Sequence, residues 1–243
     1  MSASNASVII VAAGSGRRFG SELPKQFCLL GDKPVVMHSM ERIARHMPSS
    51  DIILVLSADR MDFWRQLCRR YAFDIPHKTV AGGTTRWESV KNALEQVSAD
   101  SAFIYVHDGA RPLVSASMLN RLQAGLLTGA DGVLPVLGVT DSLRQSSDGV
   151  SSSAVDRSQF YAVQTPQAFP AEILHKSYQL PYCPTMTDDA SVVEAAGYHN
   201  IIMCEGDAAT LKITGPLDIE IAALYLKKKH VTWTASAPPT SPI

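Results

Sequence analysis

The chain has 243 residues, of which 46% are hydrophobic and 19% are charged, a composition typical of a soluble globular protein. Its 22 Lys and Arg residues almost balance 23 Asp and Glu residues, and the formal net charge of −1 argues against a nucleic-acid partner. No apolar run approaches the roughly 20 residues of a membrane span, and residues 1–7 do not resemble a secretory signal. We therefore expect a cytoplasmic protein with no membrane contact.

The four cysteines are widely separated, at positions 28, 68, 183 and 204. No CxxC pair and no Cys/His cluster has the spacing of a zinc site. We therefore predict four reduced, mostly buried thiols, with neither a disulfide framework nor a structural metal.

In the first half of the chain, short β-branched runs alternate with segments of helical spacing. Strands are predicted at 8–11, 52–56, 78–80, 103–106 and 132–137, and helices at 34–45, 59–71, around 90–97 and at 118–127. This alternation predicts a parallel α/β sheet with helices on both faces. Ligands of such sheets bind beyond the carboxyl ends of the strands, so the residues after Val11, Val80 and Val106 are candidate site positions.

The pattern changes after Val139. Strand-like pieces at 139–145 and 153–157 flank an Asp-Gly turn at 148–149, which favours a hairpin. With few large apolar residues, this hairpin is expected to project as an arm over about 138–158. The remaining elements expected are helices at 171–178, 188–196 and 216–228, strands at 200–204 and 211–214, and a disordered tail at 234–243 after a single domain covering 1–233.

The strongest local signal follows the first predicted strand, in the segment Ala12-Ala13-Gly14-Ser15-Gly16-Arg17-Arg18. Glycines at a strand end let backbone N–H groups approach phosphate oxygens. Phe19 stands where the dinucleotide fingerprint GxGxxG requires glycine, and no GxxxxGK(S/T) phosphate loop is present. Arg17, Arg18 and Lys25 add cations, which favours transfer at phosphorus. Taken alone, the segment is equally consistent with a tight turn that carries solvated arginines.

Two further motifs follow predicted strands. Gly82-Gly83-Thr84-Thr85-Arg86 could contact a flat base through its backbone, but taken alone it is better explained as a β–α turn with a threonine helix cap. The second motif is His107-Asp108-Gly109-Ala110-Arg111-Pro112. Asp108 could bind a divalent cation or a substrate hydroxyl, and Arg111 could hold a phosphate, although a structural ion pair is the alternative. His107 is assigned no role.

The order of these motifs is more specific than any one of them. A-A-G-x-G-x-R with P-K-Q, then G-G-x-x-R-x-x-S, then H-D-G-A-R-P closely resembles the 2-C-methyl-D-erythritol 4-phosphate cytidylyltransferase family. The resemblance continues through 155–157, 164–167, 187–191 and 211–214, and covers roughly residues 8–227. It implies an α/β fold: a Rossmann-like nucleotidyltransferase sheet wrapped by helices, with a projecting β-hairpin dimerisation arm.

The family transfers CMP from CTP to 2-C-methyl-D-erythritol 4-phosphate with Mg²⁺, releasing pyrophosphate in the non-mevalonate isoprenoid pathway. The resemblance implies a homodimer whose arm reaches the partner's site, and catalytic cations at Arg18, Lys25, Arg157 and Lys212. The implied nucleotide-binding positions are Ala12, Ala13, Gly14, Ser15, Gly16, Gly82, Gly83, Thr84, Ser89 and Asp108. The implied acceptor-binding positions are Asp108, Arg111, Ser142, Arg157, Thr165, Thr187 and Lys212. Asp108 is also the implied metal ligand, together with the CTP phosphates.

Four positions depart from the commonest family pattern. Thr84 stands where Asp is frequent, and Ser142 where Thr is frequent, and both keep an oxygen acceptor. Ala208-Ala209 stands where some members carry Asp-Asn, which leaves the metal to Asp108 and the triphosphate.

Two other functions remain open from the sequence. A ribitol 5-phosphate cytidylyltransferase would share the nucleotide half, and a nucleotide-binding regulatory module without turnover would share the fold. The retained cations Arg18, Lys25 and Lys212 argue against the regulatory module.

Overall fold

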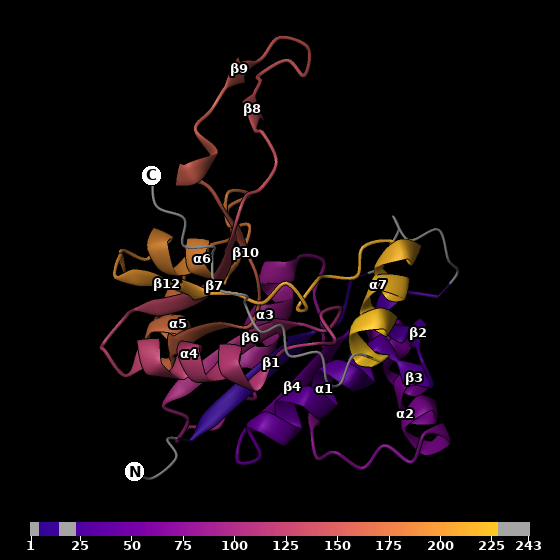
Figure 1. Cartoon of the computed structure of the whole chain (residues 1–243). Helices are drawn as coiled ribbons and strands as arrows, with labels where there is room; N and C mark the ends of the chain where they lie inside the picture. Colours follow the sequence, from indigo (N-terminus) through magenta and orange to yellow (C-terminus); the bar gives the residue numbers. More distant parts are fainter. Residues whose placement is uncertain (1–4, 15–22, 228–243) are drawn as a thin grey trace, which may run out of the picture.

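The computed structural model describes residues 5–14 and 23–227. Its centre is a mixed sheet of eight strands in the order β10-β7-β11-β6-β1-β4-β5, with β12 also paired to β7 (Figure 1). Neighbouring strands run parallel from β6 to β5 and between β7 and β12, whereas β10 and β11 are antiparallel to their neighbours. The strands are β1 (Ala6–Val11), β4 (Asp51–Leu56), β5 (Lys78–Ala81), β6 (Phe103–Asp108), β7 (Gly132–Gly138), β10 (Tyr161–Val163), β11 (Gln167–Pro170) and β12 (Ile201–Glu205).

Helices cover both faces of this sheet because the buried strand residues alternate between two cores. In β1, Val8 and Ile10 belong to one core and Ile9 to the other, and all three are fully buried. The first core is closed by α1 (Val35–His46), α2 (Met61–Arg70) and α4 (Ala116–Leu126). The second is closed by α3 (Arg86–Leu94), α5 (Ala171–Ser177) and α6 (Asp189–Ala195).

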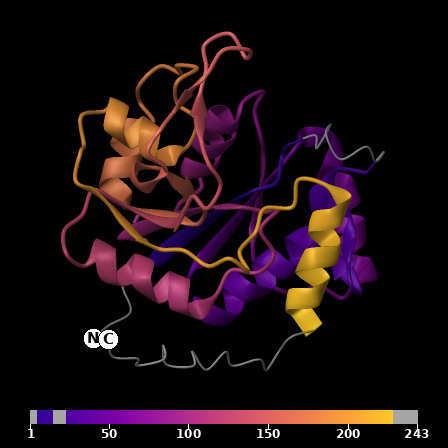
Figure 2. The same ribbon diagram turned by 45° about the horizontal axis from the view of Figure 1, so that its top comes forward.

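The last described helix, α7 (Pro216–Lys227), packs beside the small ribbon of β2 (Leu29–Leu30) and β3 (Lys33–Pro34) (Figure 2). Leu30, Ile213 and Ala222 form a third, smaller core there. Among the described residues, no helix has both the length and the apolar character that crossing a bilayer requires.

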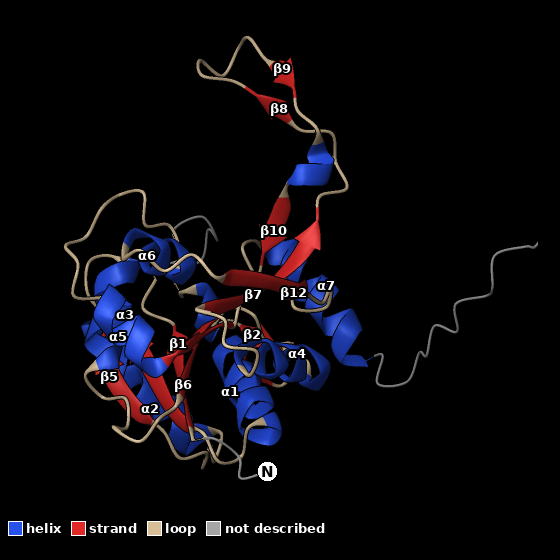
Figure 3. Ribbon diagram, turned by 90° about the vertical axis from the view of Figure 1, so that its left-hand side faces the viewer, coloured by secondary structure: helices blue, strands red, loops and turns tan. Residues whose placement is uncertain are grey.

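The hairpin predicted between 139 and 157 is present and extends away from the sheet (Figure 3). Its paired strands are short, β8 (Arg144–Gln145) and β9 (Ser153–Ala154). At its tip the Asp148 carboxylate accepts backbone N–H groups of Val150 and Ser151, and Gly149 takes a positive φ of 74°. An Asp-Gly turn thus closes the arm, as the sequence predicts.

Several predicted elements are confirmed, and four details are wrong. The segment 211–214 is not a strand, because its backbone is tied to a neighbouring loop by a single bond, Ile213 N–H to Ala110 O at 2.8 Å. The arm strands pair only over 144–145 and 153–154 and are shorter than predicted, and residue 157 begins a 3-10 turn instead of ending a strand. The sheet is mixed rather than parallel, because two strands that were not predicted, β10 and β11, run antiparallel to their neighbours. The cysteines are free, but three are half-buried and Cys183 is exposed. The predicted domain end at 233 and the tail at 234–243 lie outside the described residues.

Candidate active site

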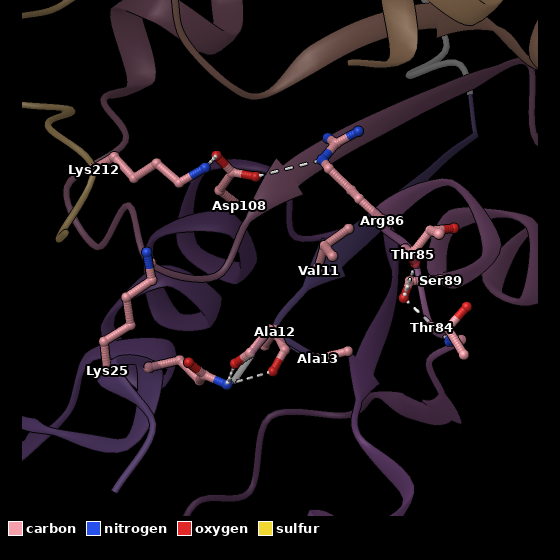
Figure 4. A pocket seen from close by; sticks show the side chains of 14 residues that line it. Val11, Ala12, Ala13, Lys25, Thr84, Thr85, Arg86, Ser89, Asp108 and Lys212 are labelled. Carbon is pink, nitrogen blue, oxygen red and sulfur yellow. Dashed lines mark hydrogen bonds and ion pairs between the residues drawn. The ribbon is translucent and has the colours of Figure 1, made fainter. Parts of the chain in front are cut away.

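A cavity of about 430 Å³ lies at the carboxyl ends of β1, β5 and β6 (Figure 4). The sequence motifs after these three strands therefore meet at one place, as expected for an α/β sheet. The cavity is lined by Val11, Ala12, Ala13, Gly14, Lys25, Gln26, Gly83, Thr84, Thr85, Arg86, Ser89, Asp108, Ala110 and Lys212.

The glycine loop begins where β1 ends. Ala12 still donates its N–H to Val55 O at 2.8 Å, and the chain then leaves the sheet. The buried Gln26 side chain donates to Ala12 O at 2.7 Å and to Gly14 O at 2.9 Å. Ser15, Gly16, Arg17 and Arg18, which were predicted to complete the loop, lie outside the described residues.

The Gly-Gly turn after β5 packs directly against the glycine loop. A Cβ on Gly82 would lie 2.5 Å from Ala13 Cβ and 2.9 Å from Ser89 Oγ, so only glycine fits there. Gly83 donates its N–H to Ser89 Oγ at 3.2 Å, and the Ser89 hydroxyl donates to Thr85 O at 2.9 Å. Thr85 caps α3 through a capping box with Glu88, and it also lines the cavity.

Asp108 is the centre of charge in the cavity. Lys212 Nζ lies 2.8 Å and Arg111 Nε 3.4 Å from its Oδ2, and Arg86 Nε lies 3.9 Å from its Oδ1. Burial raises the pKa of Asp108, but Arg86, Lys212 and Arg111 outweigh burial and hold this pKa well below its usual range. Asp108 is therefore a carboxylate at every physiological pH.

Arg86 connects this cluster to a second buried carboxylate. Its guanidinium nitrogen Nη2 lies 2.6 Å from Oδ2 of Asp189, which is fully buried. The other oxygen of Asp189, Oδ1, accepts a hydrogen bond from the Tyr178 hydroxyl at 2.7 Å. Burial lowers the pKa of Arg86, but Asp189 and Asp108 raise it above its ordinary value. Arg86 thus remains charged between two carboxylates on different elements.

Lys212 reaches Asp108 from an irregular segment. Arg111 Nη1 donates to Thr210 O at 2.9 Å, and Thr210 Oγ1 donates to Leu113 O at 3.2 Å. With the Ile213–Ala110 bond, these contacts hold the 210–213 segment against the loop after β6. The segment therefore places an ammonium in the cavity without being a strand.

The other predicted acceptor-binding residues do not line this cavity. Thr165 is buried behind Asp108 and accepts the Asp108 N–H at 2.9 Å. Thr187 is exposed ahead of α6, whereas Ser142 and Arg157 are exposed on the arm, where Arg157 donates to Thr140 O.

His107 is buried beneath the site and stays neutral. Its Nε2 lies 3.0 Å from Arg111 O and its Nδ1 3.2 Å from Thr165 Oγ1. Because a carbonyl can only accept, Nε2 carries the proton and Nδ1 accepts from the threonine. Burial lowers the pKa of His107 to about 4. The histidine therefore orients Thr165 without taking part in proton transfer.

The family profile of 2-C-methyl-D-erythritol 4-phosphate cytidylyltransferase matches residues 6–228. The chain belongs to this family. It is 43% identical over 220 residues to the enzyme of that name from Bacteroides thetaiotaomicron, covering 90% of the chain and 99% of the relative. Against the Porphyromonas gingivalis enzyme the identity is 44% over 220 residues, covering 90% and 96%. The crystal structure of 4-diphosphocytidyl-2C-methyl-D-erythritol synthase from Anaerococcus prevotii matches with a TM-score of 0.76 at 26% identity, covering 91% of this chain and 98% of that one.

These comparisons confirm the predicted family, the nucleotidyltransferase fold and the enzyme class, cytidylyltransferase. Gln26, Arg86 and Asp189 make side-chain contacts at the site but were not predicted as site residues. Each stands inside a motif that the sequence displays, next to Lys25, Thr85 and Asp188. Their roles depend on contacts between separate segments: Gln26 bonds the loop after β1, and Arg86 pairs with Asp189 of α6.

Proposed function

We propose that this cytidylyltransferase transfers CMP from CTP to 2-C-methyl-D-erythritol 4-phosphate, forming 4-diphosphocytidyl-2-C-methyl-D-erythritol and pyrophosphate for isoprenoid synthesis. One observation carries the proposal beyond family membership. A single cavity is lined by the glycine loop, the Gly-Gly turn, two lysines and an ionised aspartate. Such a cavity offers backbone groups to a nucleotide and cations to its phosphates. Because CTP is a cytoplasmic nucleotide, we propose the cytoplasm as the compartment.

The reaction needs alignment and charge stabilisation rather than a general base. A phosphate oxygen of the acceptor attacks the α-phosphorus of CTP, and the bond to the pyrophosphate oxygen breaks. The attacking oxygen is already anionic, so no proton has to be removed. Lys25 and Lys212 both extend towards the Asp108 side of the cavity (Figure 4). There they would stabilise the charge that develops on the phosphate oxygens. Arg18 and the partner subunit's Arg157 are proposed to add to this stabilisation.

The proposed metal is Mg²⁺, and Asp108 fits it. Mg²⁺ in nucleotide sites is held by one or two carboxylates plus substrate phosphates. Asp108 Oδ2 is engaged by Lys212 at 2.8 Å, whereas Oδ1 is 3.9 Å from Arg86 Nε and is the oxygen that would coordinate the cation. The described residues contain no group of three or more His, Cys, Asp or Glu side chains that could hold a metal ion, so CTP phosphates would complete its coordination. Bound there, Mg²⁺ supplies charge neutralisation on the triphosphate.

Base selection is proposed to depend on the Gly-Gly turn. Gly82 lies so close to Ala13 that an added Cβ would be 2.5 Å from Ala13 Cβ, and this close approach is proposed to leave only a narrow slot for the base between the glycine loop and α3. Ser89 and the backbone of Gly83 supply polar groups at the same wall. A narrow slot with backbone donors and acceptors favours a pyrimidine over a purine.

We also propose a homodimer assembled through the arm. At the base of the arm Phe160, Tyr161 and Val163 are 46%, 47% and 40% exposed on and beside the edge strand β10. Exposed apolar side chains on a strand edge favour pairing with another chain. Ser142 and Arg157 lie outside their own chain's cavity, which is consistent with a role in the partner's site.

The test measures pyrophosphate release by the purified protein with CTP and Mg²⁺. Release that requires 2-C-methyl-D-erythritol 4-phosphate and stops on chelation of the metal supports the proposal. Release with ribitol 5-phosphate alone would identify the related cytidylyltransferase. No release with either acceptor, together with CTP binding, would identify a regulatory module.

A further inference from the structure

Gln26 is a buried amide next to one of the proposed catalytic lysines. It lies in the 3-10 turn η2 (Lys25–Phe27), and 3% of its surface is exposed. Both hydrogen bonds of its side-chain nitrogen go to one stretch of backbone, the carbonyl oxygens of Ala12 at 2.7 Å and Gly14 at 2.9 Å. An amide nitrogen has two protons, so its donor capacity is fully used on the glycine loop.

The backbone around Gln26 is held firmly. Phe27 N donates to Pro24 O at 2.8 Å, and the Phe27 ring is buried against Phe63 in an edge-to-face contact at 5.3 Å. On the other side, Ala12 N is fixed to β4 through Val55 O. The Gln26 amide therefore links the η2 turn to the loop after β1. Its position fixes the direction in which the carbonyls of Ala12 and Gly14 point.

The direction of these two carbonyls affects how the loop can bind an anion. In a trans peptide the C=O of one residue and the N–H of the next point in opposite directions. Because the carbonyl of Ala12 faces Gln26, the N–H of Ala13 in the same peptide plane faces away from it. Carbonyl oxygens turned into the cavity would repel a triphosphate, whereas N–H groups attract it.

We propose that Gln26 is a positioning residue for the nucleotide: its amide holds the carbonyls of Ala12 and Gly14 away from the phosphates and presents the Ala13 N–H to them. The proposal rests on the CTP-dependent function above. Gln26 does not touch the reacting atoms in this role and acts through the backbone of residues 12–14.

The experiment compares the wild-type protein with Gln26→Met and Gln26→Glu. Methionine has a similar length without a donor, and an ionised glutamate places oxygen against two carbonyl oxygens. For Gln26→Met, the Kd for CTP, measured calorimetrically without acceptor, should rise roughly tenfold or more, equivalent to about 1.4 kcal/mol. Gln26→Glu should bind CTP more weakly still. The KM for the acceptor should change less than threefold in Gln26→Met.

Gln164→Met is the matched control. Gln164 is also buried and also bonds a loop, donating to Asp207 O and accepting from Asp207 N, both at 2.9 Å, but it does not line the cavity. It should lose thermal stability as Gln26→Met does, without a change in the Kd for CTP. Equal CTP affinity in wild type and Gln26→Met, or equal weakening in Gln164→Met, would overturn the positioning role. Failure of the wild-type protein to bind CTP would instead refute the proposed function.

Discussion

Asp189→Asn tests whether Arg86 is held at the site by a buried counter-charge. Asp189 has no exposed surface and accepts from both Arg86 and the Tyr178 hydroxyl. The substitution keeps the shape and one acceptor oxygen but removes the negative charge. Arg86 is then left with Asp108, which lies 3.9 Å away and is already paired with Lys212.

The expected loss follows from the burial of the pair. Removing one partner of a fully buried ion pair costs about 3–5 kcal/mol. The side chain of Arg86 is 29% exposed, and the substituted amide can still accept from Tyr178, so the expected loss is about 2–3 kcal/mol. For a chain of this length the Tm should fall by roughly 4–12 °C.

Urea unfolding and thermal melting at neutral pH measure this loss. The control is Asp62→Asn, the same change in the exposed pair of Asp62 with Arg65, whose side chains are 81% and 69% exposed. It should cost less than about 1 kcal/mol. If Asp189→Asn costs no more than this control, the buried pair does not hold Arg86 as argued.

Four further outcomes are expected. Lys25→Ala should lower kcat by roughly 10²-fold with a smaller change in CTP binding, and an unchanged kcat in the folded variant would contradict its electrostatic role. ATP and GTP should turn over far more slowly than CTP, and equal use of a purine nucleotide would refute the narrow slot. Gly82→Ala, which places a methyl group against Ala13, should raise the KM for CTP at least tenfold. Mixed dimers of Arg157→Ala and Lys25→Ala should regain up to half the wild-type activity per dimer if Arg157 serves the partner's site, and no recovery despite measured subunit exchange would exclude that arrangement.

The parallel half of the fold could be predicted because its signals are local. Val8–Val11 and Ile52–Leu56 are continuous apolar runs, and the helices between them have clear helical spacing. β10 and β11 were missed because Tyr161–Val163 and Gln167–Pro170 are short, and Pro166 and Pro170 break their pattern. Their strand character comes from pairing with β7 and β6, which no local window contains.

The candidate site, too, was only partly predictable from the sequence. Lys25, Gly83 and Asp108 are found from sequence because their motifs follow strands that end at one edge. Arg111 and Lys212 were assigned to the site, and an ion pair of Asp108 with Arg111 was one of the alternatives. The pairing of Asp108 with Arg86 and Lys212 was not predicted, since these residues lie far apart in the chain. The segment 211–214 was mistaken for a strand because its alternating pattern reflects one buried side chain, Ile213, in an otherwise irregular loop.

The position of β11 has a consequence for how the chain folds as it is synthesised. β11 lies between β6 and β7 in the sheet, although it follows both in the chain. The strands β5, β4, β1 and β6 can pair with one another once residue 108 has emerged, whereas the part built on β7 joins them only when residues 167–170 insert. Contacts across such sequence separations form slowly. The first 108 residues are therefore expected to form a partly ordered intermediate with an open edge at β6, and this edge is where a nascent chain would be most prone to pair wrongly.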